Sequence, residues 1–174
     1  TTTDAKLLAE SLALARQEIP TLQLLAIGVS IAGSRLSFRE VAQLSDGDVV
    51  DTGRVPFDRI GDYLAACDVL VLPLSDSQSN RARWPSRLND YLAAGRAIVA
   101  TRVGEVKALA ERHAFGVVTD PTAQGMADGL ISMYHNPALA REHGRRAREL
   151  AEGELCWARI VEGLEAFYMK TESR

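Results

Sequence analysis

Three arginines surround the point at which a helix is predicted to begin. Pro85 favours the first turn of a helix, because proline lacks the amide hydrogen that would be unpaired there. The amides of Ser86 and Arg87 are then expected to point outward. Arg81, Arg83 and Arg87 crowd this end, where the helix dipole is already positive and each cation costs about 0.3–1 kcal/mol. A bound anion would remove the conflict, so the segment predicts a phosphate site.

A second interpretation of the same residues needs no ligand. The arginines would then be solvated side chains, and Arg87 would pair with Asp90, three residues further along the helix. Such an exposed pair contributes only a few tenths of a kcal/mol, about 0.2–0.5. Taken alone, these residues favour the two interpretations about equally.

Segments typical of helices and strands alternate along the chain up to about residue 121. The apolar runs at 22–28 and 69–73 are typical of strands buried on both faces. Further strands are expected at 48–53, 97–101 and 116–119, and helices at 4–18, 36–44, 58–66, 85–94 and 105–112. This alternation predicts parallel strands joined by right-handed crossovers, with helices on both faces. The expected fold is therefore α/β, a doubly wound parallel Rossmann-like sheet.

The strand pattern stops after residue 121, and the rest of the chain is expected to be helical, at 122–134, 137–152 and 155–169. We expect one domain over 1–174, with residues 122–170 as its helical tail. The last helix has Trp157, Ile160 and Leu164 on one face, which is expected to pack on an apolar surface. Sheets of this kind usually start on a strand, whereas this sequence starts on a helix. A first strand is therefore expected to be missing from it.

Composition and charge exclude several classes of protein. With 174 residues and 47% hydrophobic content, the chain can bury one substantial core. Its formal net charge of −3 argues against nucleic acid as a partner. The histidines have no partner at metal-ligand spacing, so no metal site is expected. No run of about 18 apolar residues occurs and the two cysteines form no C-x-x-C pattern, which favours a cytoplasmic protein.

The run from Trp84 to Gly104 resembles a known signature. The signature consists of a proline or glycine turn, an acidic residue, a helix of small residues, a glycine, and a strand reading Pro-Val-Val-Ala-Thr. It belongs to the retaining glycosyltransferases of GT-B fold, of the group 1 or family 4 type. Residues 53–73 and 115–121 are similar to the flanking parts. The resemblance covers about 3–168 and implies the C-terminal, donor-binding domain of such an enzyme.

The resemblance implies a role for each residue of the predicted phosphate site. Asp90 occupies the position of the second glutamate in the family's E-x7-E motif, which accepts hydrogen bonds from the ribose hydroxyls. Pro85, Ser86 and Arg87 match the turn that faces the diphosphate and sugar of the donor. Arg87 is expected to stabilise the charge of the leaving group. Gly53 and Val55 match the loop that borders the nucleotide base.

The implied function is hexosyl transfer from a nucleotide-diphosphosugar, with no metal and no cofactor. The acceptor, a glycan or a lipid-linked molecule, would bind to an absent N-terminal domain and bring peripheral contact with a membrane. This chain alone is expected to be inactive.

Two features depart from the family pattern. Ala82 stands where the motif has its first glutamate, which contacts the transferred sugar, so that contact is either absent or supplied by another residue, with Asn80 and Asp76 as the candidates. The family's basic pair, which follows the expected first strand, is missing with it. A non-catalytic module for assembly or regulation therefore stays the alternative.

Overall fold

The computed structural model describes residues 2–28, 40, 44–45 and 47–172. Almost all of the helix expected at 36–44 lies outside these residues. Within them, five strands form two parallel sheets. One sheet pairs β1 (Leu24–Ala26) with β2 (Val49–Asp51), and the other has the order β3 (Val69–Leu72), β4 (Ala97–Thr101), β5 (Gly116–Thr119). The parallel arrangement predicted from the alternation is confirmed.

The helices of the described residues follow the predicted order with one addition. They are α1 (Thr2–Ala15), η1 (Phe57–Arg59), α3 (Ile60–Ala66), α4 (Gln78–Ala82), α5 (Arg87–Ala94), α6 (Gly104–Arg112), α7 (Ala123–His135), α8 (Pro137–Glu152) and α9 (Trp157–Glu172). The addition is α4, in a segment expected to be a polar loop. Ser77 begins this helix, because its hydroxyl accepts a hydrogen bond from the amide of Asn80.

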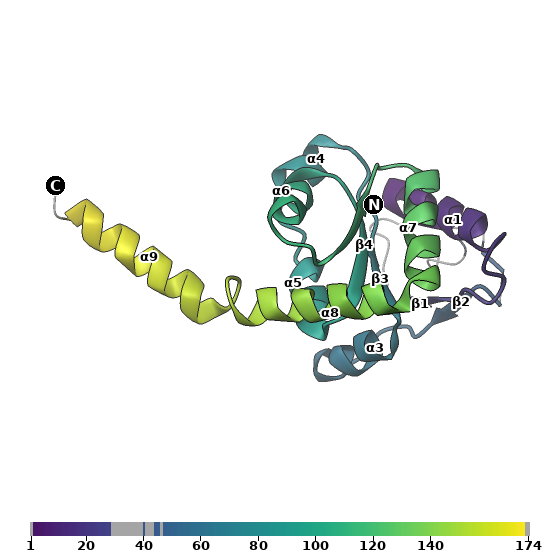
Figure 1. The fold of residues 1–174 in the computed structure, drawn as a ribbon, viewed down its shortest axis with the longest axis horizontal. Helices are drawn as coiled ribbons and strands as arrows, with labels where there is room; N and C mark the ends of the chain where they lie inside the picture. Colours follow the sequence, from purple (N-terminus) through teal and green to yellow (C-terminus); the bar gives the residue numbers. More distant parts are fainter. Residues whose placement is uncertain (1, 29–39, 41–43, 46, 173–174) are drawn as a thin grey trace.

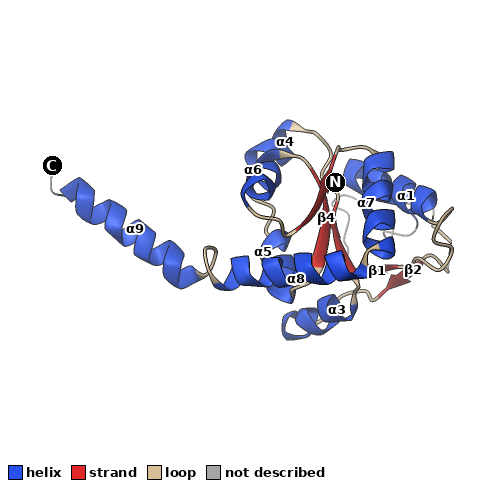
Figure 2. Ribbon diagram, in the orientation of Figure 1, coloured by secondary structure: helices blue, strands red, loops and turns tan. Residues whose placement is uncertain are grey.

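Every residue of β4 is buried, and its two faces meet different cores. Ala97 and Val99 pack into a cluster with α1 and α7, whereas Ile98 and Ala100 pack into one with α5, α6 and α8. Figure 1 and Figure 2 show α1 and α7 on one side of this sheet and α5 and α6 on the other. A strand covered on both faces must be apolar at every position, which is why a continuous apolar run predicted it. The doubly wound arrangement is confirmed.

The last helix does not pack as its apolar face suggested. In Figure 1, α9 extends away from the body of the molecule. Trp157 is 79% exposed and Leu164 is 51% exposed, and the other large apolar side chains of this helix are exposed too. The expectation that this face packs on an apolar surface is therefore wrong for the described part of the chain. Amphipathic periodicity indicates that a helix can bury one face, but not which surface covers it.

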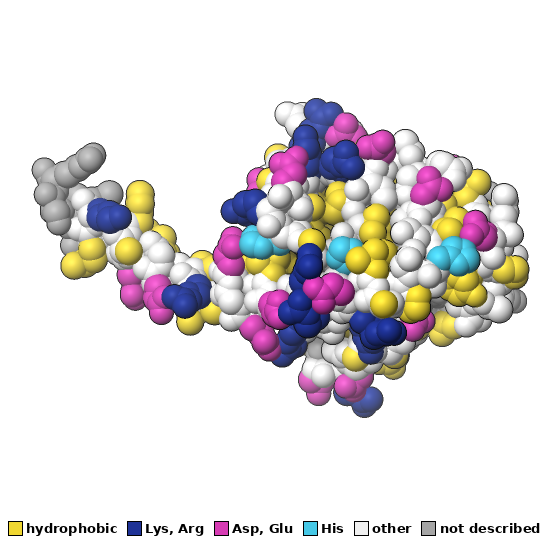
Figure 3. Space-filling model, viewed as in Figure 1, with side chains coloured by type: hydrophobic (Ala, Val, Ile, Leu, Met, Phe, Trp, Pro, Cys, Tyr) yellow, Lys and Arg dark blue, Asp and Glu magenta, His cyan; other side chains and the backbone are white. Residues whose placement is uncertain are grey.

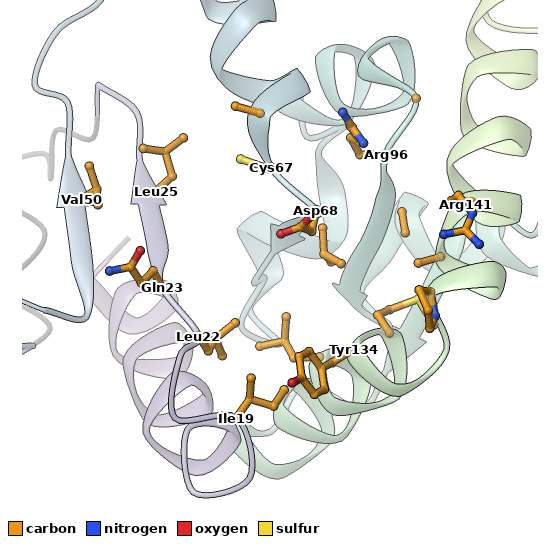
Figure 4. A pocket seen from close by; sticks show the side chains of 18 residues that line it. Ile19, Leu22, Gln23, Leu25, Val50, Cys67, Asp68, Arg96, Tyr134 and Arg141 are labelled. Carbon is orange, nitrogen blue, oxygen red and sulfur yellow. The ribbon is translucent and has the colours of Figure 1, made fainter.

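The two sheets lie on either side of a hollow of about 800 Å³. Leu22 and Leu25 line it near β1, and Asp68 and Val69 line it at the start of β3 (Figure 4). In the common doubly wound order, 3-2-1-4-5-6, the first strand stands between the second and the fourth. The orders within the two sheets, β2 beside β1 and β3 beside β4 beside β5, agree with the two flanks of that order. The first strand expected from the sequence stays a prediction.

Candidate donor site at the carboxyl ends of the strands

The candidate site lies beyond the carboxyl ends of β3 and β4, where open parallel sheets bind their ligands. Thr101, the last residue of β4, fixes the segment that follows β3. Its hydroxyl donates to the carbonyl of Leu74 at 2.7 Å and accepts from the amide of Leu74 at 2.9 Å. Both residues are buried. The base of the segment that carries the predicted phosphate site is therefore held against the sheet.

A buried carboxylate from the first helix holds the next part of this segment. One oxygen of Asp4 accepts hydrogen bonds from the amide and hydroxyl of Ser75, both at 2.7 Å, and from the side-chain amide of Asn80 at 3.2 Å. Asp4 is only 8% exposed. Its partners lie more than 70 positions away in the chain. No local pattern could have indicated this contact.

Asn80 lies inside the protein, although it was expected to contact the transferred sugar. The residue is 2% exposed, and its Nδ2 donates to Asp4 and to the carbonyl of Ser75. Its Oδ1 accepts from Nε and Nη2 of Arg83, at 3.1 and 2.8 Å. The structure thus places Asn80 between a buried carboxylate and an exposed arginine. Both ends of its side-chain amide are bonded to protein atoms.

The three arginines of the segment differ in how far their charge is neutralised. Arg81 forms two hydrogen bonds with Asp76, at 2.5 and 2.7 Å, and this pairing lowers the pKa of the Asp76 carboxyl. Asp76, the other residue expected to reach the sugar, is therefore engaged with Arg81. Arg83 and Arg87 have no carboxylate partner among the described residues. Two of the three cations are therefore not neutralised by a carboxylate of the described residues.

The first turn of α5 leaves amide hydrogens near these cations. Leu88 and Asn89 donate to the carbonyls of Pro85 and Ser86, at 2.8 and 3.1 Å, so the turn starts at Pro85, as predicted. The amides of Ser86 and Arg87 precede the first bonded ones, and the Ser86 side chain makes no capping bond. Within the described residues, nothing in the first turn satisfies these two amides. They are suited to bind an anion.

Asp90 and Arg87 share the first helical turn of α5 but have different surroundings. Asp90 is exposed. Arg87 is exposed as well, and its guanidinium lies near the phenol of Tyr91, one turn further along the helix. Burial raises the pKa of Tyr91, while the charge of Arg87 and a hydrogen bond with it oppose the increase. Arg87 would have to turn from Tyr91 toward the start of α5 to reach an anion bound there.

Gly53 and Val55 lie in the loop after β2, which belongs to the two-stranded sheet. Gly53 has a φ of 60°, in the left-handed region that favours glycine. Its amide donates to the Asp51 carboxylate and its carbonyl accepts from the amide of Gly28, both at 2.9 Å. These bonds shape the loop. Within the described residues, no hydrogen bond joins it to the segment that carries Arg83 and Asp90.

The described residues show neither the pattern of a metal site nor that of a membrane span. They contain no group of three or more histidine, cysteine or acidic side chains that could hold a metal ion. None of their helices is both long and apolar enough to span a bilayer. On the face shown in Figure 3, acidic and basic side chains are interspersed, including over α4 and α6. The cationic character of the site is therefore local.

Comparison with known proteins shows the family of this chain. The family described as "Glycosyl transferases group 1" matches residues 2–136, well over half of the chain. The chain belongs to this glycosyltransferase family. The resemblance seen between Trp84 and Gly104 is thereby confirmed, and the matched region contains both sheets and the whole candidate site.

Two curated relatives of this group 1 chain come from Bacillus subtilis (strain 168). Both are assigned as glycosyltransferases of teichuronic acid biosynthesis. TuaC is 31% identical over 84 residues, which make up 48% of this chain and 20% of TuaC. TuaH is 25% identical over 99 residues, 57% of this chain and 24% of TuaH. The matched part of the chain thus spans a quarter or less of each relative.

Solved structures share the fold at low sequence identity. Sucrose-phosphate synthase from Thermosynechococcus elongatus superimposes with a TM-score of 0.75 at 22% identity, over 98% of this chain and 44% of that one. HepE from Anabaena, solved in complex with UDP, gives 0.72 at 17% identity, over 94% and 44%. The C-terminal domain of the group 1 protein LpcC from Francisella tularensis gives 0.71 at 16% identity, over 90% and 81%. The fold is that of the C-terminal domain of a GT-B enzyme.

Proposed function

We propose that this chain is the donor-binding domain of a glycosyltransferase that takes its sugar from a nucleotide-diphosphosugar. The observation that carries the proposal is the pair of arginines, Arg83 and Arg87, which have no carboxylate partner among the described residues and belong to the same short segment as the unbonded amides of Ser86 and Arg87. Cations at the positive end of a helix are unfavourable unless an anion joins them. A donor diphosphate supplies that anion.

The nature of the anion is supported by a structural neighbour. HepE, whose fold this chain shares, has been solved with UDP and also with UDP-glucose. A nucleoside diphosphate carries a ribose as well as phosphates. An exposed carboxylate one turn into α5 suits the ribose, because it accepts hydrogen bonds from two neighbouring hydroxyls. We assign this role to Asp90, and we assign the border of the base to the loop with Gly53 and Val55.

The proposed chemistry is stabilisation of a leaving group. When the bond between sugar and diphosphate breaks, negative charge develops on the departing nucleoside diphosphate. Amides of Ser86 and Arg87 and the guanidinium groups of Arg83 and Arg87 would stabilise this charge without a metal ion. Removing one such donor typically lowers kcat by about 10²–10³-fold. Hexosyl transfer further requires an acceptor, which is a glycan or a lipid-linked molecule bound by a second domain. We therefore expect this chain alone to bind the donor without transferring its sugar.

Calorimetry with UDP, GDP and ADP tests donor binding. We expect one of the three to bind, and Asp90→Ala to weaken that binding about tenfold or more, because hydrogen bonds to a charged group contribute about 1.5–3 kcal/mol. Glu111→Ala is the matched control, since Glu111 is an exposed carboxylate on a different helix, α6. Absence of binding for all three nucleotides would refute the donor site. Unchanged affinity in Asp90→Ala would refute the ribose assignment alone.

Binding without transfer is the alternative, and Ala82 favours it. An alanine at the position of the first motif glutamate cannot hydrogen-bond to the transferred sugar. The product of the complete gene, assayed with a labelled donor and membrane extracts as the acceptor source, distinguishes the two functions. Labelled glycan or lipid is expected for a transferase. Tight nucleotide binding with no transfer of label would favour the non-catalytic module.

A further inference from the structure

We infer that Asn80 is a positioning residue, which is held by Asp4 and Ser75 and in turn aims Arg83 at the anionic part of the donor. The inference rests on the proposed function, because it concerns the same site. Its first support is the continuity of the contacts. They run from buried Asp4 through buried Asn80 to exposed Arg83, with each contact at hydrogen-bonding distance.

The orientation of the Asn80 side chain is determined by its neighbours. A carboxylate and a carbonyl accept hydrogen bonds but cannot donate them. Nδ2 of Asn80 must therefore face the Asp4 carboxylate and the Ser75 carbonyl, at 3.2 and 2.9 Å. The opposite orientation would place two oxygens against Oδ1 inside the protein, where an unsatisfied polar group is costly. Oδ1 is thus left facing Arg83.

A neutral acceptor suits the task of holding Arg83. A guanidinium group has five N–H donors, and Asn80 engages only those on Nε and Nη2. No other hydrogen bond engages the remaining donors within the described residues, and the full positive charge remains, because the amide contributes no compensating charge. Arg81 shows the contrast, since its guanidinium is paired with the Asp76 carboxylate. A carboxylate in place of Asn80 would neutralise Arg83, and it would also lose the donor that Asn80 offers to Asp4 and Ser75.

The backbone around Asn80 is fixed from a second direction. Gly104, at the start of α6, lies so close that a Cβ on it would stand 2.8 Å from the carbonyl oxygen of Asn80 and 2.9 Å from that of Arg81. The end of α4 is therefore held between α1, the segment after β3, and α6. Arg83 directly follows this helix and precedes the turn with the unbonded amides of Ser86 and Arg87. A held Arg83 and these amides belong to one short segment.

A double-mutant cycle separates positioning from simple structural support. The variants are Asn80→Ala, Arg83→Ala and the double variant, and the measurement is the affinity for whichever of UDP, GDP and ADP binds this chain best. We expect Arg83→Ala to weaken binding about tenfold or more, and Asn80→Ala about three- to tenfold, because Arg83 then has to be ordered on binding. The double variant should match Arg83→Ala within about twofold, since Asn80 acts only through Arg83.

Ser77→Ala is the matched control for stability. It removes the hydroxyl that accepts from the Asn80 amide and so weakens α4, but it touches neither Oδ1 of Asn80 nor Arg83. It should lower the melting temperature while leaving nucleotide affinity within about twofold. If it weakens binding as much as Asn80→Ala does, or if the effects of Asn80→Ala and Arg83→Ala add in full, Asn80 is structural only and the inference fails.

Arg83→Lys keeps the test decisive if Asn80→Ala does not fold. Arg83 is exposed, so the lysine should be tolerated, and it retains the charge without the planar fork that Asn80 holds. Affinity close to that of Arg83→Ala is expected, whereas affinity equal to that of the unaltered chain would overturn the inference.

A chain that binds none of the three nucleotides refutes the proposed function as well. Normal binding with no loss in Arg83→Ala refutes this inference alone.

Discussion

Replacing Gly104 by alanine measures how tightly α6 holds the end of α4. Gly104 has a φ of 54°, where a side chain costs about 1–2 kcal/mol. The added Cβ would also stand 2.8 Å from the carbonyl oxygen of Asn80 and 2.9 Å from that of Arg81. These are backbone atoms that cannot rotate away, and overpacking of this kind costs about 1–3 kcal/mol. We expect Gly104→Ala to lower the free energy of unfolding by about 2–5 kcal/mol.

Urea unfolding followed by circular dichroism measures this loss, and the melting temperature should fall by about 2–4 °C for each kcal/mol. Gly61→Ala is the matched control, because Gly61 lies in α3 and nothing stands within 4 Å of a Cβ built there. This substitution should change stability by less than about 1 kcal/mol, in the stabilising direction. A Gly104→Ala protein as stable as the unaltered chain, beside a Gly61→Ala protein that behaves as expected, would contradict the close contact between α6 and the end of α4.

The same substitution should also weaken nucleotide binding. Relief of the close contact requires the end of α4 to move, and Asn80 and Arg83 would move with it. We expect the nucleotide affinity of the folded Gly104→Ala protein to fall toward that of Asn80→Ala. Calorimetry well below the melting temperature checks this. Normal affinity together with reduced stability would show that the strain is absorbed within α6.

Three further outcomes are expected from other parts of the chain. Gly116→Ala should prevent folding or lower the free energy of unfolding by more than about 3 kcal/mol, because its Cβ would stand 1.9 Å from the carbonyl oxygen of Ile98 on the neighbouring strand. A soluble variant with an unchanged melting temperature would contradict the pairing of β4 with β5. Hydrogen bonds from two arginines, chiefly Arg145, lower the pKa of Glu142 to about 2. Any stabilisation by this carboxylate should therefore be present above about pH 4.5 and be lost only as the pH falls toward 2. An NMR titration midpoint near 4.5 would contradict the contacts. Deletion of residues 157–174 should leave the melting temperature of the rest of the chain nearly unchanged, because α9 buries little surface. A large decrease in the melting temperature would mean that α9 packs on the rest of the chain.

The strands could be predicted from the sequence because burial on both faces leaves a pattern in the residues themselves. The apolar run that ends at Thr101 was expected at 97–101, and β4 spans Ala97–Thr101. β5 was likewise expected at 116–119 and spans Gly116–Thr119, although its residues are only half-buried. In contrast, α4 was missed, because its five residues include no apolar side chain larger than alanine. It depends on the cap supplied by Ser77, and one serine in a polar segment is a weak signal.

The network around Asn80 could not be predicted, for a different physical reason. Asp4 contacts Ser75 and Asn80 across 71 and 76 residues of chain, and such a contact exists only once α1 packs beside the end of β3. The sequence placed Asn80 in the segment of the candidate site and made its side chain a candidate for contact with a ligand. Burial reverses that expectation, since a buried amide must satisfy its hydrogen bonds within the protein. The roles assigned to Asp90, Gly53 and Val55 stay predictions.

The electrostatics of the site cannot be derived by counting its arginines. Arg81 and Arg83 are two positions apart, yet one faces a carboxylate and the other a neutral amide. The difference arises from α4, which lies between Asp76 and Arg83 in the chain. The helix folds Arg81 back onto Asp76 and leaves Arg83 beside Asn80, just past its end. A segment that reads as a uniform cluster of cations is thus divided by one short helix into a neutral pair and a held, uncompensated charge.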